Sequence, residues 1–186
     1  TRDSIGKTCL GFSIGDRVCG VTRCGGYAEY VIVDSRGLIT IPENTTIGEA
    51  TALTTQYGTA YYCAYEMVNL FKGDHVLIHA AAGGVGTALI QLAKHKGCVI
   101  YGTAGSDEKL DYLKKMGVDF PINYRKQHFE EEVRKLRGKQ GIDVIFDPVG
   151  GSNYKKGRKL LSHGGRIVSY GISERSGKKG GILSDI

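Results

Sequence analysis

From residue 74 onward, short apolar runs rich in β-branched residues alternate with longer stretches in which apolar residues recur at helical spacing. The short runs predict five strands, at His75–His79, Cys98–Gly102, Phe120–Ile122, Asp143–Phe146 and Arg166–Ser169. The longer stretches predict four helices, at Val85–Lys96, Asp107–Lys115, Phe129–Arg137 and Tyr154–Leu161, with Asp107 and Asn153 as candidate caps. Because strands joined by crossover helices form a parallel sheet with right-handed connections, this pattern predicts a doubly wound α/β domain with a parallel Rossmann sheet.

The first fifty residues have a different, β-rich pattern. A turn at Gly15-Asp16 precedes a strand that begins near Arg17, and the alternating segment 26–33 predicts another strand. A third short strand, at 38–41, is ended by Pro42. These strands do not complete a barrel or sandwich of their own, so we expect residues 1–50 to be part of a β-rich domain.

A helical pattern connects this β-rich part to the α/β part. It runs from about Ile47 to Leu70, with Thr45 or Thr46 as candidate N-cap and Glu49 in the first turn. We therefore expect residues 51–186 to form the α/β domain together with this linker helix, and to be incomplete at the C-terminal end.

The turn between the first predicted strand of the α/β part and its helix is rich in small residues, with the sequence Ala80-Ala81-Ala82-Gly83-Gly84-Val85-Gly86. A glycine-rich turn from a strand into a helix lets the backbone approach a pyrophosphate, and the helix N-terminus offers unpaired N–H groups. As a G-x-G-x-x-G motif its positions are Ala81, Gly83 and Gly86, so the first glycine is replaced. A tight connection without a ligand is the alternative interpretation.

The end of the second predicted strand indicates which dinucleotide this site would take. Sites for NAD carry an acidic residue there, which binds the ribose 2′-hydroxyl. Here the strand continues through Gly105 to Ser106, and the first acidic residue is the candidate cap Asp107. Ser106 and Lys109 supply a hydroxyl and a positive charge that suit a 2′-phosphate, which favours NADP(H). Taken alone, Lys109 would be interpreted as a solvated helix lysine.

Composition describes an ordinary globular chain of 186 residues, 41% hydrophobic and 24% charged, with a net charge of +6 that fits anionic ligands. No apolar run is long enough to span a bilayer, and the N-terminus lacks a signal-peptide pattern. The five cysteines include no Cys-x-x-Cys pair, and Cys19 and Cys24 lack two further ligands at zinc-finger spacing. We therefore expect no metal site, isolated thiols and a cytoplasmic location.

Several further motifs accompany the glycine turn in a fixed order. They are Asp16-Arg17-Val18, Tyr57-Gly58-Thr59-Ala60-Tyr61-Tyr62, Gly102-Thr103-Ala104, Ile122-Asn123-Tyr124-Arg125, Asp147-Pro148-Val149-Gly150-Gly151 and Ser169-Tyr170-Gly171. Together they resemble the zinc-independent quinone oxidoreductases of the medium-chain dehydrogenase/reductase superfamily, including the ζ-crystallin-like and vesicle-amine-transport-like members. The resemblance covers residues 12 to 173. It implies that residues 1–50 are part of a GroES-like substrate domain and that the whole chain is a fragment.

The resemblance also implies an activity and a cofactor site. The activity is NADPH-dependent, zinc-independent transfer of hydride to a quinone or to an activated carbonyl or alkene, such as an enone or enal. The implied cofactor-binding residues are Gly83, Gly84, Val85 and Gly86 at the pyrophosphate; Gly105, Ser106, Lys109 and Tyr124 around the 2′-phosphate; Thr59 and Tyr62 near the nicotinamide; and Tyr170, Gly171 and Ser173 at its ribose. No residue is assigned a catalytic role: packing is favoured for Tyr57, and His79 is interpreted as a structural histidine whose hydrogen bonds are satisfied.

Other functions remain open on the sequence alone. An enoyl-thioester reductase of the same superfamily shares these cofactor motifs. The net charge of +6 also allows a module that binds NADPH or RNA without catalysis, although no nucleic-acid motif is present. A fragment that binds the cofactor and catalyses nothing is a further alternative. Pairing into a homodimer in the full-length protein is implied by the resemblance alone.

Overall fold

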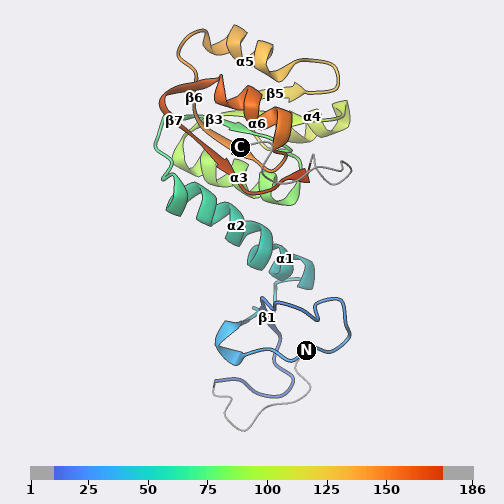
Figure 1. Ribbon diagram of the computed structural model, residues 1–186. Coiled ribbons are helices and arrows are strands. Elements are labelled where there is room, and N and C mark those ends of the chain that lie inside the picture. The colour runs from blue at the N-terminus through green and yellow to red at the C-terminus, as the bar shows by residue number, and fades with distance from the viewer. Residues whose placement is uncertain (1–10, 174–186) are drawn as a thin grey trace. The chain divides into compact units, whose positions relative to one another are not determined.

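The computed structural model describes residues 11–173 and divides the chain into two compact units, with the boundary between Gly58 and Thr59 (Figure 1). The first unit contains β1 (Val18–Gly20) and β2 (Leu38–Thr40), which pair antiparallel, and the short helix η1 (Ser35–Gly37). The assignment of this unit to a GroES-like domain stays a prediction.

The strand expected at 26–33 does not form. Alternation predicts a strand only where one face becomes buried against a partner, and here neither face is buried. Tyr27 is fully exposed and Ile32 is 99% exposed. The expectation was therefore wrong for this segment.

The expected helical region is confirmed as four consecutive segments, α1 (Ile47–Ala52), η2 (Leu53–Tyr57), α2 (Gly58–Tyr61) and η3 (Tyr62–Met67), where η2 and η3 have π-helical hydrogen bonds. Thr46, one of the two candidates, is the N-cap. Its hydroxyl accepts from the Glu49 backbone N–H, and the Glu49 carboxylate accepts from the Thr46 backbone N–H. This reciprocal capping box explains why the helix begins at Ile47.

The second unit contains the predicted parallel sheet. Its strands are β3 (His75–Ile78), β4 (Val99–Ala104), β5 (Phe120–Asn123), β6 (Ile142–Asp147) and β7 (Leu161–Ser169), in the order β5-β4-β3-β6-β7. The helices between them are α3 (Gly84–Lys96), α4 (Asp107–Lys115), α5 (Phe129–Arg137) and α6 (Gly151–Arg158) (Figure 1). With right-handed crossovers, this order places α3 and α4 on one face and α5 and α6 on the other. The Rossmann-like fold is confirmed.

Two of the expected helix caps were wrong. Ser106, and not Asp107, caps α4, because its hydroxyl oxygen accepts from the Lys109 backbone N–H. Helix α6 begins three residues earlier than expected, so Asn153 lies inside its first turn. The reason is the conformation at the start of α6, where the N-cap Gly150 and the first helical residue, Gly151, adopt positive φ angles of 73° and 55° that favour glycine.

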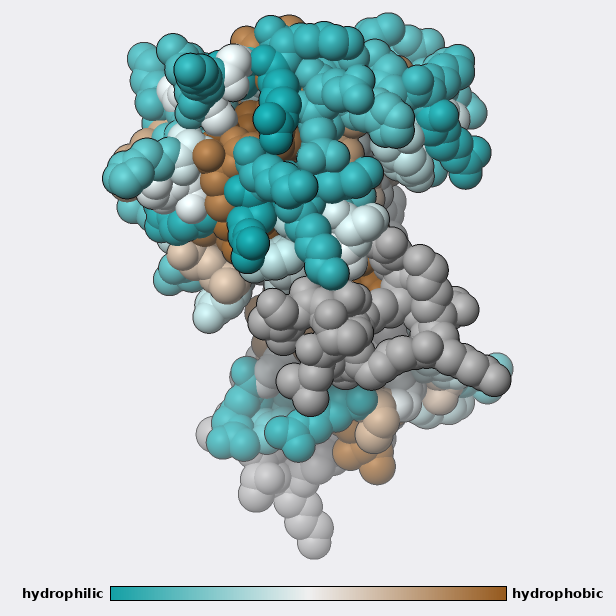
Figure 2. Space-filling view, turned by 45° about the horizontal axis from the view of Figure 1, so that its top comes forward, coloured by the Kyte–Doolittle hydropathy of each residue, from teal (hydrophilic) through white to brown (hydrophobic). Residues whose placement is uncertain are grey.

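The core of the second unit positions the carboxyl ends of the strands. Its cluster of buried side chains comprises Leu77, Tyr101, Ile122, Phe129, Val133, Ile142, Ile145 and Leu160. These residues come from β3 to β6 and from α5 or the segment before β7, so the four strands are held in register by one apolar layer. Figure 2 shows hydrophilic residues over most of the visible surface of this unit, with a hydrophobic strip between them. No helix within 11–173 is long and apolar enough to cross a membrane.

Candidate functional site

A pocket of about 390 Å³ lies at the carboxyl ends of the parallel strands in the second unit. The strand order reverses here, because β4 lies on one side of β3 and β6 on the other. Open α/β sheets bind ligands at this switch point. The pocket is lined by His79, Ala80, Thr103, Tyr124, Gln127, His128, Phe129, Val149, Ser152, Asn153, Lys156 and Ser173.

The glycine turn has the geometry of a close approach between a strand end and a helix. A Cβ on Gly86 would lie 2.6 Å from the Ala80 carbonyl oxygen and 2.7 Å from that of Ala81, so only glycine fits without a shift. The turn accommodates the methyl group of Ala81, and the backbone N–H of Ala81 donates to the Thr103 carbonyl. The N-cap Gly83 has no side chain to cap α3, which leaves the N–H groups of the first turn available to an anion.

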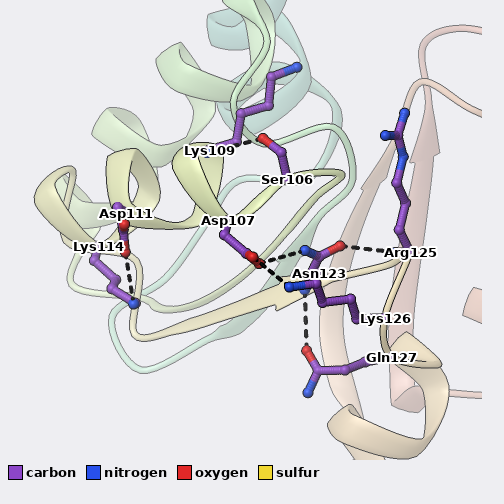
Figure 3. A network of polar contacts seen from close by, with 9 residues as sticks. All are labelled: Ser106, Asp107, Lys109, Asp111, Lys114, Asn123, Arg125, Lys126 and Gln127. Carbon is purple, nitrogen blue, oxygen red and sulfur yellow. Dashed lines mark hydrogen bonds and ion pairs between the residues drawn. The ribbon is translucent and has the colours of Figure 1, made fainter.

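Two of the predicted 2′-phosphate residues, Ser106 and Lys109, lie at the start of α4, directly after β4 (Figure 3). Ser106 is half-buried at the N-cap of α4, and Lys109 lies exposed in its first turn. A Cβ on Gly105 would lie 2.6 Å from the Tyr124 hydroxyl oxygen, so the tyrosine reaches directly over this glycine. The structure therefore brings Gly105, Ser106 and Tyr124 together around one small surface.

The segment after β7 is fixed against the turn after β6. The Tyr170 backbone N–H donates to the Asp147 carbonyl and that of Ser173 to the Pro148 carbonyl, each at 3.1 Å. A Cβ on Gly171 would lie 2.7 Å from the same Pro148 carbonyl oxygen, so glycine is required there too. Burial raises the pKa of the half-buried Tyr170, which keeps its phenol protonated.

Only Tyr124 and Ser173, among the predicted site residues, line the pocket itself. Thr59 is half-buried on α2 and Tyr62 is exposed on η3, and neither is a lining residue. The other ten lining residues were not among the predicted site residues. Four of them are His79, Ala80, Thr103 and Phe129, and the remaining six are Gln127, His128, Val149, Ser152, Asn153 and Lys156. They follow β5 and β6 within a turn or two. The rule that carboxyl ends of parallel strands bind ligands, applied to these strands as well, would have found them.

His79 and Asp147 form a buried pair at the ends of the adjacent strands β3 and β6, each 1% exposed. His79 Nδ1 lies 3.2 Å from the Thr103 hydroxyl, and its ring meets Phe129 edge to face with centroids 4.7 Å apart. His79 Nε2 and Asp147 Oδ2 have no hydrogen-bond partner among residues 11–173. The expectation of a fully satisfied histidine was therefore wrong for Nε2.

The electrostatics of this pair keep the imidazole neutral. Burial lowers the pKa of His79 to about 4, and the nearby Asp147 carboxylate offsets this only in part. Asp147 uses its other oxygen, Oδ1, to accept from the backbone N–H groups of Val149 and Gly150 at 2.8 and 3.1 Å. The carboxylate thus organises the turn that forms one wall of the pocket.

Residues 11–173 contain no group of three or more histidine, cysteine or acidic side chains placed to hold a metal ion. The four cysteines in this range, Cys19, Cys24, Cys63 and Cys98, have free thiols.

Comparison with known proteins gives a consistent set of relatives. A family described as zinc-binding dehydrogenase matches residues 84–183. The human protein named synaptic vesicle membrane protein VAT-1 homolog is 40% identical over 171 residues, which cover 91% of this chain and 43% of that protein. The structure of Escherichia coli quinone oxidoreductase complexed with NADPH aligns with a TM-score of 0.87 and 28% identity, over 97% of this chain and 55% of that one.

A second solved structure, the CurK enoyl reductase, aligns with a TM-score of 0.84 and 30% identity, over 91% of this chain and 52% of that one. The chain thus spans about half the length of these relatives.

Proposed function

The chain belongs to the zinc-binding dehydrogenase family, and on that premise we propose that it is the cofactor-binding part of an NADPH-dependent oxidoreductase. The reaction would be a zinc-independent hydride transfer to a quinone or to an activated carbonyl or alkene. The observation that carries the proposal is the arrangement of side chains where the adjacent strands β4 and β5 end. The Tyr124 phenol reaches over Gly105 there, and the next residue, Ser106, caps α4. Asp107, the first carboxylate after β4, is already bound by Lys126 and Asn123.

The residues present fit a dinucleotide. In the proposal, Gly83, Gly84, Val85 and Gly86 hold the pyrophosphate, because the Gly86 contact leaves no room for a side chain and the first turn of α3 is uncapped. Gly105, Ser106, Lys109 and Tyr124 surround the 2′-phosphate. The Ser106 oxygen accepts from the Lys109 N–H, which leaves the hydroxyl proton free to donate to an anion.

The nicotinamide end would lie along the segment after β7. We place its ribose at Tyr170, Gly171 and Ser173, and its ring near Thr59 and Tyr62. The contact between Gly171 and the Pro148 carbonyl supports this, because it holds the segment at the carboxyl edge of the sheet. When bound, NADPH supplies the hydride, and the protein contributes orientation and exclusion of water. We assign no catalytic acid.

A second candidate is an enoyl-thioester reductase, which the likeness to the CurK enoyl reductase favours. It would use the same cofactor residues and differ in the acceptor. Quinones and enoyl thioesters differ in size and charge, so a substrate panel separates the two candidates.

We also propose that the full-length protein is a cytoplasmic homodimer. The free thiols at all four described cysteines support a reducing compartment. Within residues 11–173, β7 pairs with β6 alone, which leaves one side of β7 able to accept a further strand.

The test is cofactor binding and turnover by the full-length protein. Titration should give an NADPH Kd at least tenfold below that for NADH, and NADPH should be oxidised with quinones, enals or enoyl thioesters in a small panel. Equal affinity for the two cofactors would contradict the 2′-phosphate assignment. Binding without oxidation of NADPH by any acceptor would contradict the enzymatic part.

A further inference from the structure

Three cationic side chains lie near the place where the adjacent strands β4 and β5 end, and they differ in whether the protein itself supplies a partner for their charge. The Lys126 ammonium forms an ion pair with Asp107 Oδ2, so its positive charge is balanced by a carboxylate of the protein itself. Lys109 is exposed on α4. Arg125 is exposed as well, and its guanidinium makes no hydrogen bond or ion pair with any residue from 11 to 173.

The Arg125 side chain extends toward the proposed phosphate surface. Its Nε lies 3.4 Å from the position that a Cβ on Gly105 would take, close to where the Tyr124 hydroxyl also reaches. Figure 3 shows the Lys109 and Arg125 side chains extending to the same side of the network, whereas Lys126 turns toward Asp107. Lys109 and Arg125, which form no ion pair with the residues that the structure describes, therefore extend on either side of Gly105 and Ser106.

The backbone of Arg125 is held in place by the buried side-chain amide of Asn123. Asn123, 3% exposed, accepts from the Arg125 N–H through Oδ1 at 3.1 Å and donates through Nδ2 to Asp107 Oδ1 at 2.9 Å. These two bonds tie the loop after β5 to the first residue of α4. Because Asn123 is buried, water does not compete for them, and the Arg125 backbone is held in the loop beside the start of α4.

We propose that Arg125 is a further ligand of the cofactor's 2′-phosphate and determines the preference for NADPH over NADH, an inference that rests on the function proposed above. A phosphate monoester presents three acceptor oxygens and up to two negative charges. The planar guanidinium offers two parallel N–H donors to such a group, and it has no acceptor for the 2′-hydroxyl of NADH to donate to. Since Asp107 is paired with Lys126, the nearest carboxylate is neutralised.

The experiment compares Arg125→Gln with Arg134→Gln in the full-length protein. Arg134 lies exposed in the last turn of α5 and carries the same charge change away from the strand ends. Fluorescence titration with NADPH and NADH, and displacement by adenosine 2′,5′-bisphosphate and adenosine 5′-monophosphate, isolate the adenosine end. Arg125→Lys keeps the charge without the two-donor fork and should give an intermediate effect.

Arg125→Gln is expected to raise the Kd for NADPH and for the bisphosphate by about 10- to 100-fold, as for loss of a charged hydrogen bond, and to leave NADH and the monophosphate unchanged. Arg134→Gln should change neither. If the wild type prefers NADPH and Arg125→Gln retains that preference within threefold, Arg125 is not a ligand and the inference is overturned alone. If the wild type shows no preference, the proposed cofactor assignment fails, and this inference with it.

Discussion

At the residue scale, the most unusual group is His79, an imidazole that is almost fully buried and forms only one hydrogen bond with residues 11–173. Thr103 contacts one ring nitrogen, and Phe129 covers the ring edge to face. The neutral form is favoured because burial penalises the charged form more than Asp147 favours it. His79 therefore contributes no positive charge to the pocket at neutral pH.

This burial predicts a loss of stability in acid. The unfolded chain takes up a proton at His79 near the ordinary pKa of 6.5, whereas the folded protein does so only near pH 4. Between these values the unfolded state binds more protons, so the free energy of unfolding falls as the pH falls, by up to roughly 3 kcal/mol. Urea denaturation at pH 7, 6, 5 and 4 measures this dependence.

The variant His79→Asn keeps a donor and acceptor near Thr103 and removes the titrating ring, so its unfolding free energy should vary less over this range. His163→Asn, at an exposed site on β7, is the matched control and should behave as the wild type. A wild-type slope that survives in His79→Asn would assign the acid sensitivity to other groups.

At the scale of elements, the site depends on the turns that connect the strands to the helices. Strand β3 enters α3 through the tight Gly86 contact, and β6 enters α6 through the Asp147 carboxylate and two glycines with positive φ. Ala80 in the first turn and Val149 in the second line the pocket. The residues that cap α4 and brace β5 complete the same edge.

Gly86→Ala tests the first of these turns. Its methyl would lie within 2.8 Å of backbone atoms of Ala80 and Ala81, which cannot move without displacing β3 or α3. We expect a loss of about 1–3 kcal/mol in unfolding free energy, together with weaker binding of both NADPH and NADH. Gly157→Ala in α6 is the control, since its methyl would meet Ile145 Cδ1 at an ordinary 3.4 Å. A Gly86→Ala protein as stable as Gly157→Ala would contradict the close packing.

At the scale of the whole molecule, the chain consists of two units, and the proposed phosphate-binding residues all lie in the second. A ligand that binds only the folded state stabilises that state by mass action, by about 2.7 kcal/mol at a concentration 100 times its Kd. The stabilisation should be concentrated in the elements that form the carboxyl edge of the sheet.

Hydrogen exchange with and without NADPH measures this distribution in the full-length protein. Peptides that cover 79–86, 104–109 and 123–129 should gain protection, and those that cover β1 should not. NADH at the same concentration should protect 79–86 and leave 104–109 little changed, because only the 2′-phosphate engages the latter. Equal protection by both cofactors at 104–109 would contradict the assignment of Ser106 and Lys109.

Local patterns in the sequence determined much of this protein. The strand and helix positions of the α/β part follow from hydrophobic spacing, and the parallel Rossmann sheet follows from their alternation and the handedness of crossovers. The glycine turn and Ser106 were predicted from their spacing along the chain, and Tyr124 from the family resemblance. Helix α6 was misplaced because its start depends on the conformation of Gly150 and Gly151, which spacing does not reveal.

Only the tertiary structure decided features that depend on contacts between distant segments. The alternation at 26–33 was not enough to form a strand, because strand formation needs a partner to pair with and a surface to be buried against. Likewise, Arg125 and Lys126 are adjacent cations in the sequence, but Asp107, from another element, binds Lys126, whereas no side chain in the described range 11–173 binds the Arg125 guanidinium. Hydrophobic period sets which elements form, whereas the fold sets which of their polar groups meet.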